Sequence, residues 1–128
     1  MDDNAQRICD PMKPEILYVN DKPCIITYCD RVIDVDPSGR SLNDGQYDPW
    51  DRTIRIYDGG RSFEEIWHTM FHEIIHVIEV DLKRNFDEDT VDLLALGING
   101  VFFRNRLFSI GHSAFIPGLR SEPKEFEI

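Results

Sequence analysis

The chain has 128 residues, a length that fits one compact domain, and its 41% hydrophobic content is enough for a buried core. The 24 acidic residues outnumber the 14 basic ones, and the formal net charge of −10 disfavours binding to nucleic acid or anionic lipid. No apolar run approaches the roughly 20 residues of a membrane helix, and the N-terminus lacks the pattern of a secretion signal. We therefore expect a single cytoplasmic domain, 1–128, without a nucleic-acid or membrane partner.

The cysteines agree with a cytoplasmic location. Cys9, Cys24 and Cys29 are odd in number and do not have the spacing of a metal site. Cys24 and Cys29 are five positions apart in an apparent strand, so their side chains point to opposite faces and cannot easily pair. We expect reduced thiols, as is usual for cytoplasmic proteins.

The first half of the chain predicts a small β-sheet. Residues 1–15 are polar and predict a loose lead-in, whereas β-branched and aromatic residues dominate 16–19 and 24–29. The turn-forming residues 20–23 join these two segments into a predicted hairpin, which 32–35 either extends or follows as a further short strand. Residues 36–45 predict a loop. Residues 53–57 then alternate between apolar and polar side chains, which predicts a half-buried strand.

The second half predicts two helices. Ser62 and Glu65 fit a capping box, and the first helix should run from there to about Lys83. One continuous apolar stripe follows from spacings of three and four, and it consists of Phe63, Ile66, Trp67, Met70, Phe71, Ile74, Ile75 and Ile78. A second helix runs from about Glu88 to about Leu107, and residues 109–128 predict an irregular tail. The expected fold is α+β, with an antiparallel sheet of about three strands packed on the first helix.

The first helix carries the pattern H-E-x-x-H at 72–76. Two imidazoles one turn apart, here His72 and His76, can direct ring nitrogens at one ion about 2.0–2.1 Å away. Glu73 lies about 100° round the helix from His72, where its carboxylate can reach a water molecule without binding the metal. The pattern therefore predicts a zinc site with Glu73 as the general base. The competing interpretation is that both histidines are ordinary surface residues.

A catalytic zinc site needs a third protein ligand and leaves the fourth position for water. The residues alone leave several candidates open, namely His68, Glu79, Glu88, Asp89 and Asp92. His68 and Glu79 are one turn too far along the same helix, and we expect Glu79 to orient His76 or to stay solvated. A ligand from the second helix is geometrically easier. There Asp92 interrupts an apolar run, a costly place for a charge without a partner.

Segments 72–79 and 87–97 together resemble the small zincin-like metallopeptidases of phages and prophages, near the ImmA/IrrE group. The resemblance covers about residues 44–105, including 45–48 and 53–56, which resemble the strand before the motif helix. It implies that His72, His76 and Asp92 bind the metal, although the family has glutamate where Asp92 stands. It further implies zinc-dependent hydrolysis of a protein or peptide substrate.

The sequence thus predicts a zinc metallopeptidase in which Glu73 activates water. The alternative is a non-catalytic metal-binding interaction protein of phage or prophage type, and a weaker one is a metal-free interaction domain. His112 is a guess for the residue that stabilises the reacting carbonyl oxygen. The competing interpretation is that His112 is a structural or merely exposed histidine.

Overall fold

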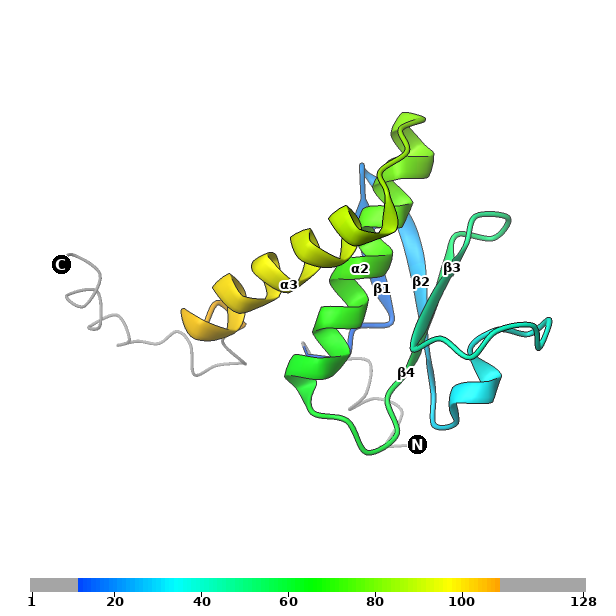
Figure 1. The fold of residues 1–128 in the computed structure, drawn as a ribbon, viewed down its shortest axis with the longest axis horizontal. Helices are drawn as coiled ribbons and strands as arrows, with labels where there is room; N and C mark the ends of the chain where they lie inside the picture. Colours follow the sequence, from blue (N-terminus) through cyan, green and yellow to red (C-terminus); the bar gives the residue numbers. More distant parts are fainter. Residues whose placement is uncertain (1–11, 109–128) are drawn as a thin grey trace, which may run out of the picture.

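The computed structural model describes residues 12–108, and within this range the chain forms one four-stranded sheet and two long helices (Figure 1). The strands are β1 (Ile16–Val19), β2 (Lys22–Cys29), β3 (Gly45–Asp48) and β4 (Thr53–Tyr57). The helices are α2 (Phe63–Leu82) and α3 (Glu88–Arg104), and a short 3-10 helix, η1 (Val32–Asp34), follows β2. The predicted α+β class is confirmed.

The sheet is mixed, whereas the sequence predicted an antiparallel one. Its order is β1-β2-β4-β3, with antiparallel pairing at both edges and parallel pairing between the central strands β2 and β4. The parallel pair arises because residues 30–52, which include β3, carry the chain back before β4 enters beside β2. Local sequence patterns do not report such long-range pairing. The predicted hairpin is confirmed, and Asn20 and Asp21 form its turn with φ of 54° and 66°.

Helix α2 lies between the sheet and α3 (Figure 1). Towards the sheet it buries Met70 and Val77 in a core shared with Ile54 of β4. On its other side Ile75 packs with two residues of α3, Val91 and Ala95. Because two faces of α2 are covered, its buried set is wider than the predicted apolar stripe and includes Val77, which that stripe omits.

The predicted start of α2 is confirmed. The Ser62 hydroxyl accepts a hydrogen bond from the Glu65 amide at 3.1 Å, and the Glu65 carboxylate accepts one from the Ser62 amide at 2.8 Å. The helix ends at Leu82, and Lys83 takes a left-handed conformation with φ of 56°. Helix α3 begins after Asp87, whose side chain accepts from Thr90 N, and it ends three residues before the predicted Leu107.

Further expectations concern residues 32–35, the cysteines and the two ends of the chain. Residues 32–34 form η1 and not a strand. Cys24 and Cys29 are buried free thiols; Cys24 belongs to the main core, and the Cys29 thiol faces the Asp34 carbonyl oxygen at 3.7 Å. Cys9, His112, most of the lead-in and the tail 109–128 lie outside residues 12–108. Within that range no helix combines the length and apolar character that crossing a bilayer requires.

Candidate metal centre

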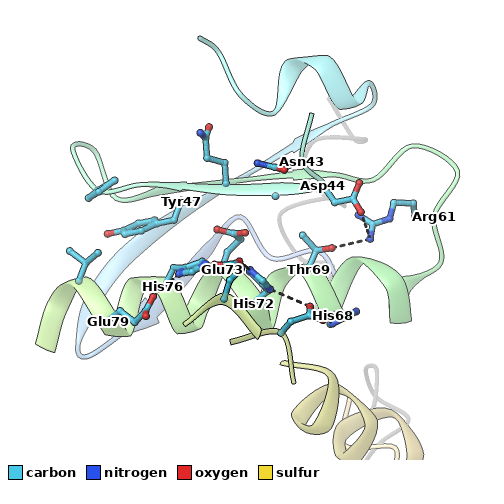
Figure 2. A pocket seen from close by; sticks show the side chains of 16 residues that line it. Asn43, Asp44, Tyr47, Arg61, His68, Thr69, His72, Glu73, His76 and Glu79 are labelled. Carbon is cyan, nitrogen blue, oxygen red and sulfur yellow. Dashed lines mark hydrogen bonds and ion pairs between the residues drawn. The ribbon is translucent and has the colours of Figure 1, made fainter. Parts of the chain in front are cut away.

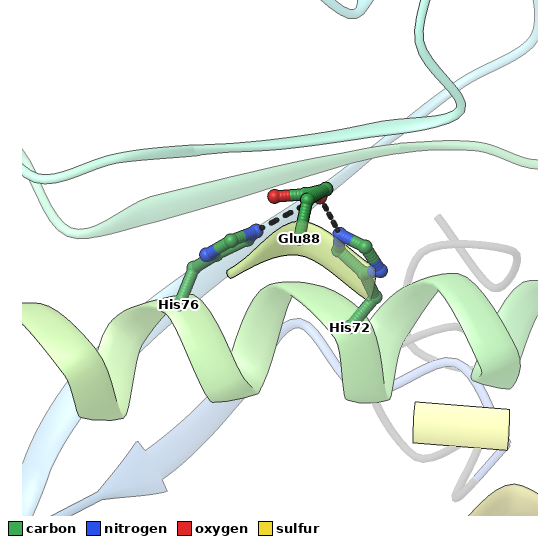
Figure 3. Close-up of side chains that lie close together, drawn as sticks. All are labelled: His72, His76 and Glu88. Carbon is green, nitrogen blue, oxygen red and sulfur yellow. Dashed lines mark hydrogen bonds and ion pairs between the residues drawn. The ribbon is translucent and has the colours of Figure 1, made fainter. Parts of the chain in front are cut away.

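Two histidines of α2 and one glutamate of α3 converge on a common point (Figure 3). The rings of His72 and His76 lie on the same side of α2 with centroids 4.9 Å apart. The Glu88 Oε2 atom is 2.7 Å from His72 Nε2 and 3.5 Å from His76 Nε2. The motif histidines therefore present one nitrogen each to the same carboxylate oxygen.

The connection between the helices puts Glu88 above the histidines. Glu88 is the first residue of α3, directly after the N-cap Asp87. The preceding residue, Phe86, donates its backbone N–H to Glu79 Oε2 at 2.6 Å. Because Glu79 belongs to the last turns of α2, this bond ties the start of α3 to α2 one turn beyond His76. The short link between α2 and α3 therefore keeps Glu88 close to the histidines.

The donor set fits a zinc ion. All three donor atoms, from His72, His76 and Glu88, lie within 4.8 Å of one another. Two tetrahedral ligands at the usual zinc distance are about 3.3 Å apart, close to the 3.5 Å between His76 Nε2 and Glu88 Oε2. The 2.7 Å bond from His72 to Glu88 must open slightly. The Glu88 side chain can make this adjustment because it is 68% exposed.

His76 has a second carboxylate on its other ring nitrogen. The Glu79 Oε1 atom lies 2.6 Å from His76 Nδ1, a contact that agrees with the first of the two alternatives expected for Glu79, orienting this ring or staying solvated. Burial acts to lower the pKa of His76, but the bond to Glu79 and the nearby carboxylates outweigh it and raise the pKa. Burial likewise acts to raise the pKa of Glu79, yet the Phe86 amide and His76 lower it. Glu79 is therefore a charged acceptor that fixes Nε2 of His76 towards Glu88.

Asp92 occupies the corresponding place beside His72. Its Oδ1 atom is 3.5 Å from His72 Nδ1 and 3.4 Å from His68 Nε2. The His68 Nε2 atom is buried and has no well-directed hydrogen-bond partner in residues 12–108, although Asp92 is within ion-pair distance. This arrangement differs from the predicted ligand set of His72, His76 and Asp92. Asp92 faces Nδ1 of His72, whereas Glu88 faces Nε2, the nitrogen directed at the common point. Asp92 is one helical turn further from the connection, on the same side of α3 as Glu88.

Glu73 is buried beside the histidines, between α2 and β3. The residue is 6% exposed, and burial raises its pKa to about 6 although the nearby His76 and His72 act to lower it. The backbone of Tyr47 in β3 also acts to lower the pKa of this carboxyl. A Cβ atom on Gly45 would lie 3.0 Å from Glu73 Cγ. The glycine therefore allows β3 to approach α2 closely enough to enclose Glu73.

An open pocket of about 800 Å³ lies over this group, with β3 along one side and the polar face of α2 along the other (Figure 2). The site side chains of α2 and α3 line it together with Gly45, Gln46 and Tyr47 of β3. At one end Arg61 is held by hydrogen bonds to Tyr57 O at 2.7 Å and Thr69 Oγ1 at 2.9 Å. The three candidate ligands and Glu73 are thus accessible from one cavity.

Comparisons of the chain with family models, with curated proteins and with solved structures found no match. The resemblance to the ImmA/IrrE group therefore stays a prediction.

Sequence reasoning gave Glu88 only as one of several alternatives and gave Gly45 no role. The signal for Glu88 is its position immediately after the N-cap Asp87, because the first residue of α3 lies nearest to the end of α2. No local pattern reveals that Gly45 contacts α2, since this contact joins residues that are far apart in sequence.

Proposed function

We propose that the chain is a zinc-dependent peptide hydrolase. His72, His76 and Glu88 would hold the ion, and Glu73 would act as the general base. The observation that carries the proposal is the convergence of two imidazole nitrogens and one carboxylate oxygen beside a buried carboxylate, all in an open pocket. Three protein ligands are the usual number in catalytic zinc sites, where the fourth position is left for water or substrate.

A zinc ion in this group would supply Lewis acidity, which polarises a carbonyl oxygen and makes water a nucleophile near neutral pH. Glu73 would accept the proton of the attacking water and deliver it to the amine as the peptide bond breaks. The Glu73 carboxylate is suited to this role because Gly45 and Tyr47 of β3 lie over it and keep it next to both histidines.

The position of β3 favours a peptide as substrate. Among the described strands β3 pairs only with β4, so its other edge is unpaired and borders the pocket. Tyr57 N donates to Asp44 O, and in this register the backbone groups of Gly45 and Tyr47 point to the unpaired edge. The Tyr47 backbone faces Glu73 closely enough to act on its pKa, so the groups of Gly45 are the ones we expect to bind an extended peptide.

We further propose a cytoplasmic location and no nucleic-acid or membrane partner. The odd number of cysteines, without the pattern of a disulfide framework, supports a reducing compartment. The net charge of −10 argues against binding to phosphate-rich surfaces.

The test is zinc content and peptide cleavage of the Glu73→Gln variant, with casein as substrate. The variant should retain one zinc per chain and lose cleavage at least about 100-fold, because general-base catalysis contributes 10²–10⁴-fold. Glu64→Gln is the matched control, since Glu64 is an exposed glutamate of the same helix, and it should behave as the parent chain.

Undiminished cleavage by Glu73→Gln would contradict the assigned role. If the parent chain takes up no zinc, or His72→Ala and His76→Ala bind it as well as the parent, the metal centre is wrong. Stoichiometric zinc without cleavage of any peptide would contradict the hydrolase and support the non-catalytic metal-binding alternative.

A further inference from the structure

The outer face of α3 is apolar and uncovered among the described residues. Figure 1 shows α3 crossing α2 and extending past it, and its contacts with the rest of the described fold are made mainly to α2. Val91, Ala95 and Asn99 face α2 and are buried. The exposed apolar side chains of the helix are Leu93 (67% exposed), Leu94, Leu96, Ile98 and Val101. Apolar surface gathered on one helix in this way marks a site of protein association.

The charges of α3 are segregated to its two ends. Of the acids in the first turns, Glu88 and Asp92 face the histidines of α2, whereas Asp89 is exposed away from them. The basic residues Arg104 and Arg106 lie at the other end. No charged residue stands between Asp92 and Arg104. The helix therefore has an acidic end, an uncharged apolar middle and a basic end.

We propose that this face binds the same face of a second copy of the chain, with the two α3 helices antiparallel. A two-fold axis near Gly97 brings the acidic end of each helix against the basic end of the other, and such an interface is self-complementary. The register places Leu93 against Val101 and Asp89 beside Arg104 of the other copy. A Cβ atom on Gly97 would meet nothing within 4 Å, so the middle of the helix leaves room for close approach.

Other occupants fit this face less well. Parallel α3 helices would bring acidic ends together, and like charges at an interface are costly. An anionic lipid surface would repel the acidic end of α3. In an antiparallel pair the facing ends of the two α3 helices have opposite charges, and this local complementarity favours a second copy as the occupant.

The dimer does not depend on the proposed zinc site, because its apolar contacts use the side of α3 that faces away from α2. The test is the molar mass of the full-length chain by light scattering and sedimentation over a range of concentrations, with zinc and with a chelator. We expect a dimer in both conditions. Leu93→Glu should produce a monomer, whereas Leu42→Glu should not, although Leu42 is a comparable leucine at 69% exposure.

Charge reversals test the antiparallel register. Asp89→Arg and Arg104→Asp should each raise the dimer dissociation constant about tenfold or more, because each places like charges together at both ends of the interface. Mixing the two variants should restore association, since every cross-helix pair is then Arg–Asp. Asp51→Arg, in an exposed loop, is the control. A parent chain that stays monomeric, or a mixture no tighter than the single variants, would overturn the proposal; a monomer would mean that the tail or another protein covers α3.

Discussion

Gly45 offers the sharpest test of how the site is built, because its backbone touches the motif helix. A Cβ atom at this position would lie 2.5 Å from Thr69 Cγ2, 3.0 Å from Glu73 Cγ and 3.2 Å from Glu73 Oε2. These are closer than ordinary van der Waals contacts, so Gly45→Ala must push β3 away from α2 or displace both side chains. The cost should be that of an overpacked core, about 1–3 kcal/mol.

The assay is denaturant and thermal unfolding followed by circular dichroism. For about 100 folded residues, each kcal/mol corresponds to a fall in Tm of roughly 4–8 °C. Gly45→Ala should therefore unfold at least about 4 °C below the parent chain. It should also lose peptide cleavage, because Glu73 moves relative to His72 and His76.

The companion variant is Gly45→Ala with Thr69→Ser. Serine removes the Cγ2 atom that makes the 2.5 Å contact and keeps the hydroxyl that accepts from Arg61. We expect this double variant to regain at least half of the lost stability. If Gly45→Ala is as stable as the parent within about 0.5 kcal/mol, the usual range for surface substitutions, β3 does not approach α2 as described. If Thr69→Ser gives no recovery, the steric reasoning is wrong.

Two further predictions concern buried or partly buried carboxylates. Glu79→Gln retains an acceptor for the Phe86 amide but loses the charge that orients His76. Zinc affinity, measured by competition with a chelator, should therefore fall about 10–100-fold. An unchanged affinity would show that Glu79 does not orient His76 for metal binding. The hydrogen bond from Arg52 lowers the pKa of Asp81. The Asp81 carboxylate therefore stabilises the fold above about pH 4, which is its approximate pKa in the unfolded chain. This stabilisation is lost as the pH falls through the lower pKa of the folded state. Asp81→Asn should therefore lower the free energy of unfolding by roughly 1–2 kcal/mol at pH 7, and the difference from the parent chain should shrink towards pH 2 in unfolding curves; a constant difference would refute the ion pair as its cause.

The elements that the sequence predicted well are those fixed by local chemistry. The capping box joins Ser62 to Glu65, three residues away, and the helical spacing of His72 and His76 alone places both rings on one side. The hairpin turn at Asn20 and Asp21 is equally local. In each case the interacting residues are separated by a few positions, so that the sequence pattern specifies the geometry.

The features that the sequence predicted poorly depend on contacts between distant segments. The parallel pairing of β2 and β4 brings Ile26 beside Ile54, 28 positions away. The third candidate ligand depends on the angle at which α3 crosses α2. The family resemblance implied Asp92 as the third ligand, and its position in an apolar run supported this choice, but most of that run is exposed on α3. The polar residue was therefore not in a buried environment, and the argument from the cost of burying a charge did not apply.

Glu79 connects the two parts of the site. One of its carboxylate oxygens bonds to the ring of His76, and the other accepts the Phe86 amide just before α3 begins. The same side chain thus orients one candidate ligand and fixes the connection that carries another, Glu88. The helical spacing of the motif can place two histidines, but a third ligand from another helix needs a fixed crossing point. The bidentate use of Glu79 supplies that point, because the carboxylate is 9% exposed and both of its oxygens are occupied.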